Sequence, residues 1–111
     1  MNIQIFGSSK SFDTKKAERW CKERRIKYQY IDLLSKGLSP REYNSVKQKV
    51  GFDALVNTKC RAYEELYMPY ITPEAREEKL LMYPELFNAP IVRNGKDATV
   101  GYCPDIWAKW E

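Results

Sequence analysis

The sequence contains no histidine and only three cysteines, and both scarcities narrow the chemistry that it can carry. Without histidine it lacks the commonest general base and the commonest metal ligand of proteins. Cys21, Cys60 and Cys103 are odd in number and form no Cys-x-x-Cys pair, which argues against a disulfide framework and against a zinc site. The residues alone therefore predict no metal and no cofactor.

Long apolar runs are also missing. The uninterrupted hydrophobic stretches span only a few residues, far short of the roughly 20 that a membrane-spanning helix needs. The N-terminus opens directly on the strand-like residues 3–6, without the charged segment, apolar stretch and cleavage site of a signal peptide. We therefore expect a cytoplasmic protein with no membrane partner.

Charge of one sign is not in large excess either. Nineteen basic residues stand against fifteen acidic ones, and basic and acidic side chains occur side by side in much of the chain, as in residues 15–19 and 22–25. Such a mixed surface is typical of solvation, so nucleic acid is not an expected partner. With 43% hydrophobic and 31% charged residues, the 111 residues fit one globular domain, 1–111.

The first third of the chain has the pattern of a β-α-β unit. Residues 3–6 predict a buried strand that ends at Gly7, and residues 28–32 predict a second one. Between them Ala17, Trp20 and Cys21 follow helical spacing, with Asp13 or Thr14 available to cap the helix. A unit of this length indicates two parallel strands.

The remainder predicts helices followed by a β-β-α unit. Ser39-Pro40-Arg41-Glu42 forms a capping box that opens a helix to about Val50, and Gly51 ends it. A turn at 52–56 and helices at about 60–67 and 72–82 should follow. Residues 89–92 and 99–102 predict an antiparallel hairpin turning at 94–97, and Pro104 begins a last helix. The predicted fold is α/β and thioredoxin-like, a mixed four-stranded sheet with a helical insert at about 39–87.

These motifs together resemble the ArsC/Spx family, whose members are arsenate reductase-like, glutaredoxin-related thioredoxin-fold proteins. Phe6-Gly7 followed by Ser11 resembles the first strand and the active-site loop of that family. Residues 56–59, Val-Asn-Thr-Lys, resemble its central segment, and residues 89–92, Ala-Pro-Ile-Val, resemble the strand at its cis-proline. The match extends over nearly the whole chain in the right order, and it predicts that Pro90 is cis.

The sequence departs from the family at the residues that carry its chemistry. The resemblance places Ser11 where the family has its nucleophilic cysteine, and a serine hydroxyl cannot perform thiol chemistry. By the same resemblance, Ala89 occupies the position of an arginine that binds the oxyanion in the family. Lys59 occupies at best the position of a second such arginine, and a lysine cannot form the paired N–H hydrogen bonds of a guanidinium group. We therefore expect a degenerate member that acts as an anion- or protein-binding module, with Lys10, Ser11, Lys59 and Arg61 around the anion.

Two alternatives remain open. One is an arsenate reductase or glutaredoxin-type oxidoreductase that acts on an oxyanion or thiol substrate, with glutathione as the candidate cofactor. Its nucleophile is either Cys60, activated by neighbouring cations, or the cysteine that an engineered Ser11 replaced. The other is an Spx-like regulator that binds the C-terminal domain of the RNA polymerase α-subunit. Gly51 matches the glycine at that contact, although a helix-ending glycine also has an ordinary capping role.

Overall fold

The computed structural model describes residues 2–110, which form a four-stranded sheet with helices on both of its faces. In chain order the elements are β1 (Ile3–Gly7), α1 (Phe12–Glu23), β2 (Tyr28–Asp32), α2 (Leu33–Lys36), α3 (Pro40–Val50), α4 (Phe52–Leu55), α5 (Arg61–Glu65), η1 (Met68–Tyr70), α6 (Pro73–Met82), η2 (Pro84–Leu86), β3 (Ile91–Asn94), β4 (Asp97–Val100) and α7 (Pro104–Ala108). None of the helices in the described part of the chain is both long and apolar enough to span a membrane.

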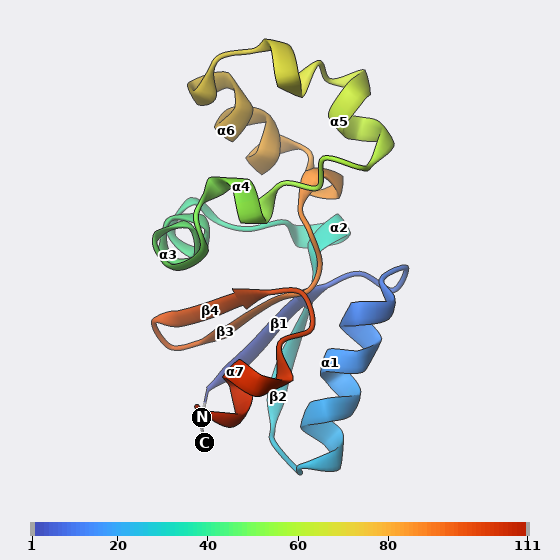
Figure 1. The fold of residues 1–111 in the computed structure, drawn as a ribbon, viewed down its shortest axis with the longest axis vertical. Coiled ribbons are helices and arrows are strands. Elements are labelled where there is room, and N and C mark those ends of the chain that lie inside the picture. Colours follow the sequence, from blue (N-terminus) through green and yellow to red (C-terminus); the bar gives the residue numbers. More distant parts are fainter. Residues whose placement is uncertain (1, 111) are drawn as a thin grey trace.

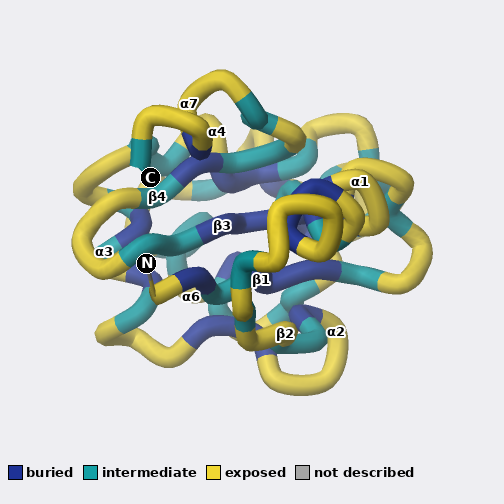
Figure 2. Tube along the Cα trace, turned by 90° about the horizontal axis from the view of Figure 1, so that it is seen from below, coloured by how far each residue is buried: buried dark blue, intermediate teal, exposed yellow. Residues whose placement is uncertain are grey.

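The sheet is mixed and has the strand order β2-β1-β3-β4. β1 pairs in parallel with β2, whereas β3 pairs in antiparallel orientation with both β1 and β4. The two central strands are mostly buried, and β2 forms a more exposed edge (Figure 2). This is the thioredoxin arrangement, so the predicted fold class is confirmed.

Side chains that alternate along the strands divide the interior into two cores. Ile3 and Ile5 of β1 face α1 and α7, where they pack with Trp20 and Trp107. Phe6 faces the opposite side and joins the larger core under the helices from α2 to α6. Figure 1 shows this division, with α1 and α7 below β3 and β4 and beside β2, and the remaining helices above the sheet.

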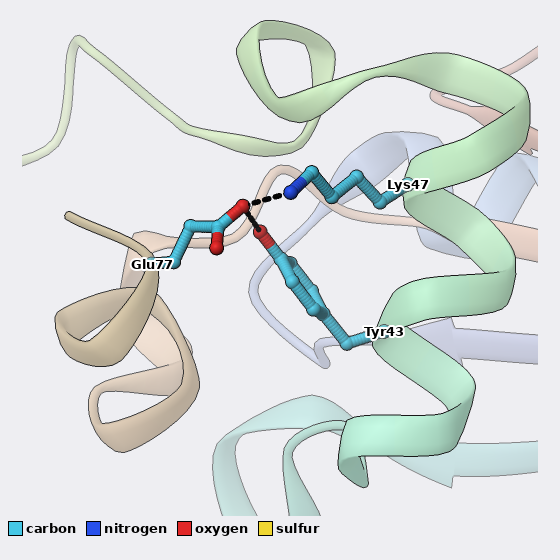
Figure 3. Close-up of polar contacts among 3 residues, drawn as sticks. All are labelled: Tyr43, Lys47 and Glu77. Atoms are coloured by element: carbon cyan, nitrogen blue, oxygen red, sulfur yellow. Dashed lines mark hydrogen bonds and ion pairs between the residues drawn. The ribbon is translucent and has the colours of Figure 1, made fainter. Parts of the chain in front are cut away.

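A polar trio connects two of the upper helices (Figure 3). The Tyr43 hydroxyl and the Lys47 ammonium group, both on α3, donate to the same carboxylate oxygen of Glu77 on α6. The hydrogen bond from Lys47 lowers the pKa of the Glu77 carboxyl group, while burial, with Glu77 beside it, raises the pKa of Tyr43. The trio therefore contributes a charged attachment of α6 to the rest of the fold.

Several predicted boundaries were wrong. β3 and β4 occupy Ile91–Asn94 and Asp97–Val100, because the hairpin turn is tight and pairs Asn94 directly with Asp97. The short turn predicted at 52–56, in a stretch predicted to be helical, is the one-turn helix α4, whereas the helix predicted at about 60–67 is reduced to Arg61–Glu65. The helices between β2 and β3 begin at Leu33 rather than at about residue 39, because Asp32 accepts a hydrogen bond from the Leu34 amide and caps α2.

Candidate functional site

The loop between β1 and α1 is held by a close contact of Gly7 with Thr14. A Cβ atom on Gly7 would lie 2.3 Å from Thr14 Cγ2, so only glycine fits here without movement of its neighbour. The buried Thr14 accepts a hydrogen bond from the Ser8 amide through Oγ1 at 3.3 Å. This packing places Ser8 and Ser11 at the N-terminal end of α1.

Ser11 is the N-cap residue of α1, and neither Asp13 nor Thr14 caps the helix as predicted. Its hydroxyl oxygen accepts a hydrogen bond from the Thr14 amide at 3.2 Å, and its hydroxyl group donates to the Ala89 carbonyl oxygen at 3.4 Å. Asp13 and Thr14 already lie inside the first helical turn, because the helix begins at Phe12. The Ser11 hydroxyl group is therefore hydrogen-bonded to two backbone groups of the fold, one as donor and one as acceptor.

The opposite wall is built from two segments that are far apart in the sequence. The Asn57 amide donates to the Leu86 carbonyl at 2.7 Å, and the Asn88 amide donates to the Leu55 carbonyl at 2.8 Å. The side-chain nitrogen of Asn88 donates to two further carbonyls, those of residues 54 and 56, at 2.9 and 3.0 Å. These bonds hold Asn57 and Asn88 at a fixed place opposite the Ser11 loop.

Between these walls lies a cavity of about 420 Å³, which we call the Ser11 cavity. Its polar lining comes from Ser8, Lys10, Ser11, Asn57, Glu85 and Asn88, and its apolar lining from Leu33, Leu34, Pro84, Phe87 and Ala89. The positive end of the α1 dipole and the Lys10 ammonium group favour an anion here, whereas Glu85 opposes one. The apolar lining favours a ligand with a carbon skeleton.

The structure brings only some of the predicted site residues together. Lys10 and Ser11 line the cavity, whereas Lys59, Cys60 and Arg61 do not belong to its lining. Arg61 is exposed and lies 3.8 Å from Glu65, an ion pair along α5. The Lys59 amide donates to the Asn57 side-chain oxygen at 3.0 Å, while the Lys59 side chain is exposed. Of the four residues predicted to surround an anion, only Lys10 and Ser11 therefore line this cavity.

The three thiols all lie outside the cavity lining. Cys60 is half-buried against the upper core, and its sulfur donates to the Asn57 carbonyl at 3.2 Å. Cys21 is buried in the core beneath α1, and burial raises the pKa of its thiol. Burial also raises the pKa of Cys103, whose sulfur donates to the Val100 carbonyl at 3.4 Å. Raised pKa values keep both of these sulfurs in the less reactive thiol form.

Pro90 and Gly51 have structural explanations. The Ala89–Pro90 bond is cis, as predicted, and Pro90 is buried behind the cavity residue Ala89. Gly51 ends α3 with φ of +83°, a conformation that favours glycine, and a Cβ atom added there would meet nothing within 4 Å. The backbone conformation alone therefore accounts for a glycine at this position.

Asn88 and Glu85 line the cavity but were not predicted as site residues. Asn57 was noticed only as part of a family motif, and its position in the lining depends on the pairing with residues 86–88. Neither missed residue belongs to a recognisable local pattern. No cluster of three metal-ligating side chains occurs within residues 2–110.

Comparisons with known proteins agree with this architecture. A family model described as the ArsC family matches residues 6–110. An arsenate reductase of Vibrio cholerae superposes with a TM-score of 0.85 at 22% identity, covering 98% of this chain and 97% of the other. For an ArsC-family-related protein of Bacteroides fragilis the TM-score is 0.81 at 22% identity, with coverages of 100% and 98%. No curated protein is significantly similar in sequence.

Proposed function

The chain belongs to the ArsC family, and we propose that it binds a small organic anion in the Ser11 cavity without thiol chemistry. The observation that carries this proposal is the state of Ser11. Its hydroxyl caps α1 and donates to the Ala89 carbonyl, at the position where the family resemblance implies a reactive thiol. No thiol takes its place, because none of the three cysteines lines the cavity.

The lining supports a carboxylate ligand more than a bare inorganic oxyanion. Lys10 and the first turn of α1 provide positive potential at one end of the cavity. Leu33 and Phe87 provide apolar contact beside it. A tight oxyanion site would need several convergent cations, and Ala89 supplies a methyl group where a guanidinium group would help. A glutathione-like peptide carboxylate fits this combination of one cation and an apolar wall.

A thiol oxidoreductase is the second candidate, and one contact favours it. The Cys60 sulfur donates to the backbone carbonyl of Asn57, and Asn57 lines the cavity, so the thiol lies against one residue of the cavity wall. Similar folds occur in arsenate reductases, such as that of Vibrio cholerae. This candidate also includes the case in which Ser11 is an engineered replacement of a native cysteine. Binding to RNA polymerase gains no support from Gly51, whose positive φ explains it.

A turnover assay separates the two candidates. The protein would be incubated with arsenate, reduced glutathione and glutaredoxin, and oxidised glutathione would be followed by a coupled reductase. We expect no rate above that of the mixture without protein, and the same result for Cys60→Ala. A rate that disappears in Cys60→Ala, with its folding intact, would reject the binding proposal in favour of the oxidoreductase.

A further inference from the structure

The positive charge of the protein is concentrated in one segment. Residues 15–27 contain seven basic and two acidic residues, a net charge of +5, while the whole chain carries +4. The other residues therefore hold twelve basic and thirteen acidic side chains, a net charge of −1. Most of this segment is α1, which packs beside α7 beneath the sheet (Figure 1). The Ser11 cavity uses none of these charges.

Part of this segment lines a second hollow of about 440 Å³, which we call the basic groove. Lys16, Arg19, Trp20, Glu23 and Arg24 of α1 and its C-cap form one wall, and Tyr102, just before α7, stands opposite. The groove shares no lining residue with the Ser11 cavity. Arg19 lies eight residues from Ser11, about 12 Å along the helix axis. The two hollows are therefore separate sites.

Aromatic rings hold two of the groove's cations in place. The Arg24 guanidinium carbon lies 4.4 Å from the centre of the Trp20 ring, and the Lys16 nitrogen lies 5.8 Å from the centre of the Tyr102 ring. Both rings pack edge-on against the buried Trp107, at 5.4 and 5.6 Å. Cations positioned in this way lose less conformational entropy when a ligand binds.

The groove's cations are also free of acidic partners. The ion pairs among residues 2–110 are Lys47–Glu77, Lys49–Asp97 and Arg61–Glu65, none of which includes a groove residue. Glu23 lies four residues from Arg19 on the helix yet forms no ion pair with it. Lys16 and Arg19, three residues apart, repel each other, which costs the helix some stability. The lining thus contains three cations that form no ion pair with a described residue, Lys16, Arg19 and Arg24, and one carboxylate.

Trp20, which lines the groove, also carries an unsatisfied hydrogen-bond donor. Its side chain is 4% exposed, and its indole nitrogen is buried without a hydrogen-bond acceptor among the described residues. By contrast, the indole of Trp107 donates to the Thr99 hydroxyl at 2.8 Å. A buried donor with no acceptor is uncommon in folded proteins, and an oxyanion is an acceptor of the kind it lacks.

We infer that the basic groove binds a small anion that carries linked phosphate groups. Two guanidinium groups and one ammonium group match several phosphate oxygens, because guanidinium groups bind phosphate through paired N–H donors. A volume of about 440 Å³ accommodates more than a single phosphate. Linked phosphates also occur along nucleic-acid backbones, but a bounded hollow between α1 and Tyr102 favours a small molecule over an extended strand.

Inorganic tripolyphosphate is a suitable probe for the full chain at 0.15 M salt. Intrinsic tryptophan fluorescence, to which Trp20 contributes, should report saturable binding, because an anion bound beside Arg24 changes the environment of the Trp20 ring. The double variant Arg19→Gln/Arg24→Gln should weaken binding by about tenfold or more. Lys15→Gln/Lys22→Gln is the matched control, since it removes the same charge from the same helix outside the groove. It should change the affinity by less than about threefold.

Glu23→Gln tests the same site in the opposite direction. Removing the groove's carboxylate should tighten tripolyphosphate binding by roughly threefold, a gain that a misfolded variant would not give. The inference is overturned if both double variants weaken binding equally, if no saturation occurs, or if a single-stranded oligonucleotide binds through these residues and tripolyphosphate does not. Lys10→Gln should leave this binding unchanged, so the result is independent of the fate of the Ser11 cavity.

Discussion

Replacing Ser11 by alanine measures what this hydroxyl contributes to the fold. The change removes the acceptor for the Thr14 amide at 3.2 Å, and loss of a serine N-cap costs about 1 kcal/mol of stability. It also removes the donor to Ala89, but at 3.4 Å this O–H···O contact is long and adds little. We therefore expect the free energy of unfolding to fall by about 1 kcal/mol, and Tm by about 4–6 °C.

Urea unfolding followed by tryptophan fluorescence gives the free energies, with two comparison variants. Ser39→Ala removes the cap of α3, where the hydroxyl oxygen accepts from the Glu42 amide at the same distance of 3.2 Å, and should cost a similar amount. Ser11→Asn keeps a strong capping acceptor and should stay within about 0.5 kcal/mol of the unmodified protein. A loss below about 0.3 kcal/mol in Ser11→Ala, with a normal loss in Ser39→Ala, would refute the capping role.

Three further outcomes follow from the packing, the polar trio and the thiols. Gly7→Ala should lower the free energy of unfolding by about 1–3 kcal/mol, because the added Cβ meets Thr14 Cγ2. Adding Thr14→Ser should recover part of this loss, and free-energy changes that simply add in the double variant would contradict the contact. The lowered pKa of Glu77 stabilises the fold above the unfolded value of about 4.3, and this contribution disappears as pH falls through the folded pKa. In Glu77→Gln the urea concentration at half-unfolding should therefore fall less steeply at acid pH than in the unmodified protein. An equally steep fall would contradict the trio's role. At pH 8 a thiol reagent followed by mass spectrometry should modify the half-exposed Cys60 before the buried Cys21, whose pKa is raised; the reverse order would be inconsistent with the packing.

Most of the fold could be predicted because its strongest signals are local. The capping box at Ser39 and the glycine at 51 defined α3 to the residue, and the short strand-like run of residues 3–6, ended by Gly7, located β1. By contrast, α2 has only four residues, too few for a helical period to be recognised. The hairpin was shifted because its turn geometry, rather than the hydrophobicity of the strands, fixes which residues pair.

The candidate site was predicted in part, for a different reason. Lys10 and Ser11 adjoin a strand-to-helix junction, and such junctions can be read from the sequence. The role of Asn88 depends on two carbonyl groups more than 30 positions earlier in the chain, and no sequence pattern reports contacts of that kind. Lys59 was included because the resemblance places it at a family arginine, and Arg61 as part of a basic rim around the loop. Both side chains are exposed, and neither lines the cavity.

Binding of S-methylglutathione tests most directly whether the Ser11 cavity takes an organic anion without thiol chemistry. Its sulfur is blocked, so any binding is independent of thiol exchange. In ¹H–¹⁵N spectra we predict saturable shifts at the amides of Ser8, Ser11 and Asn57, weakened by Lys10→Gln but not by Lys15→Gln, which lies on α1 outside the cavity. The absence of saturable shifts at these amides would contradict the account.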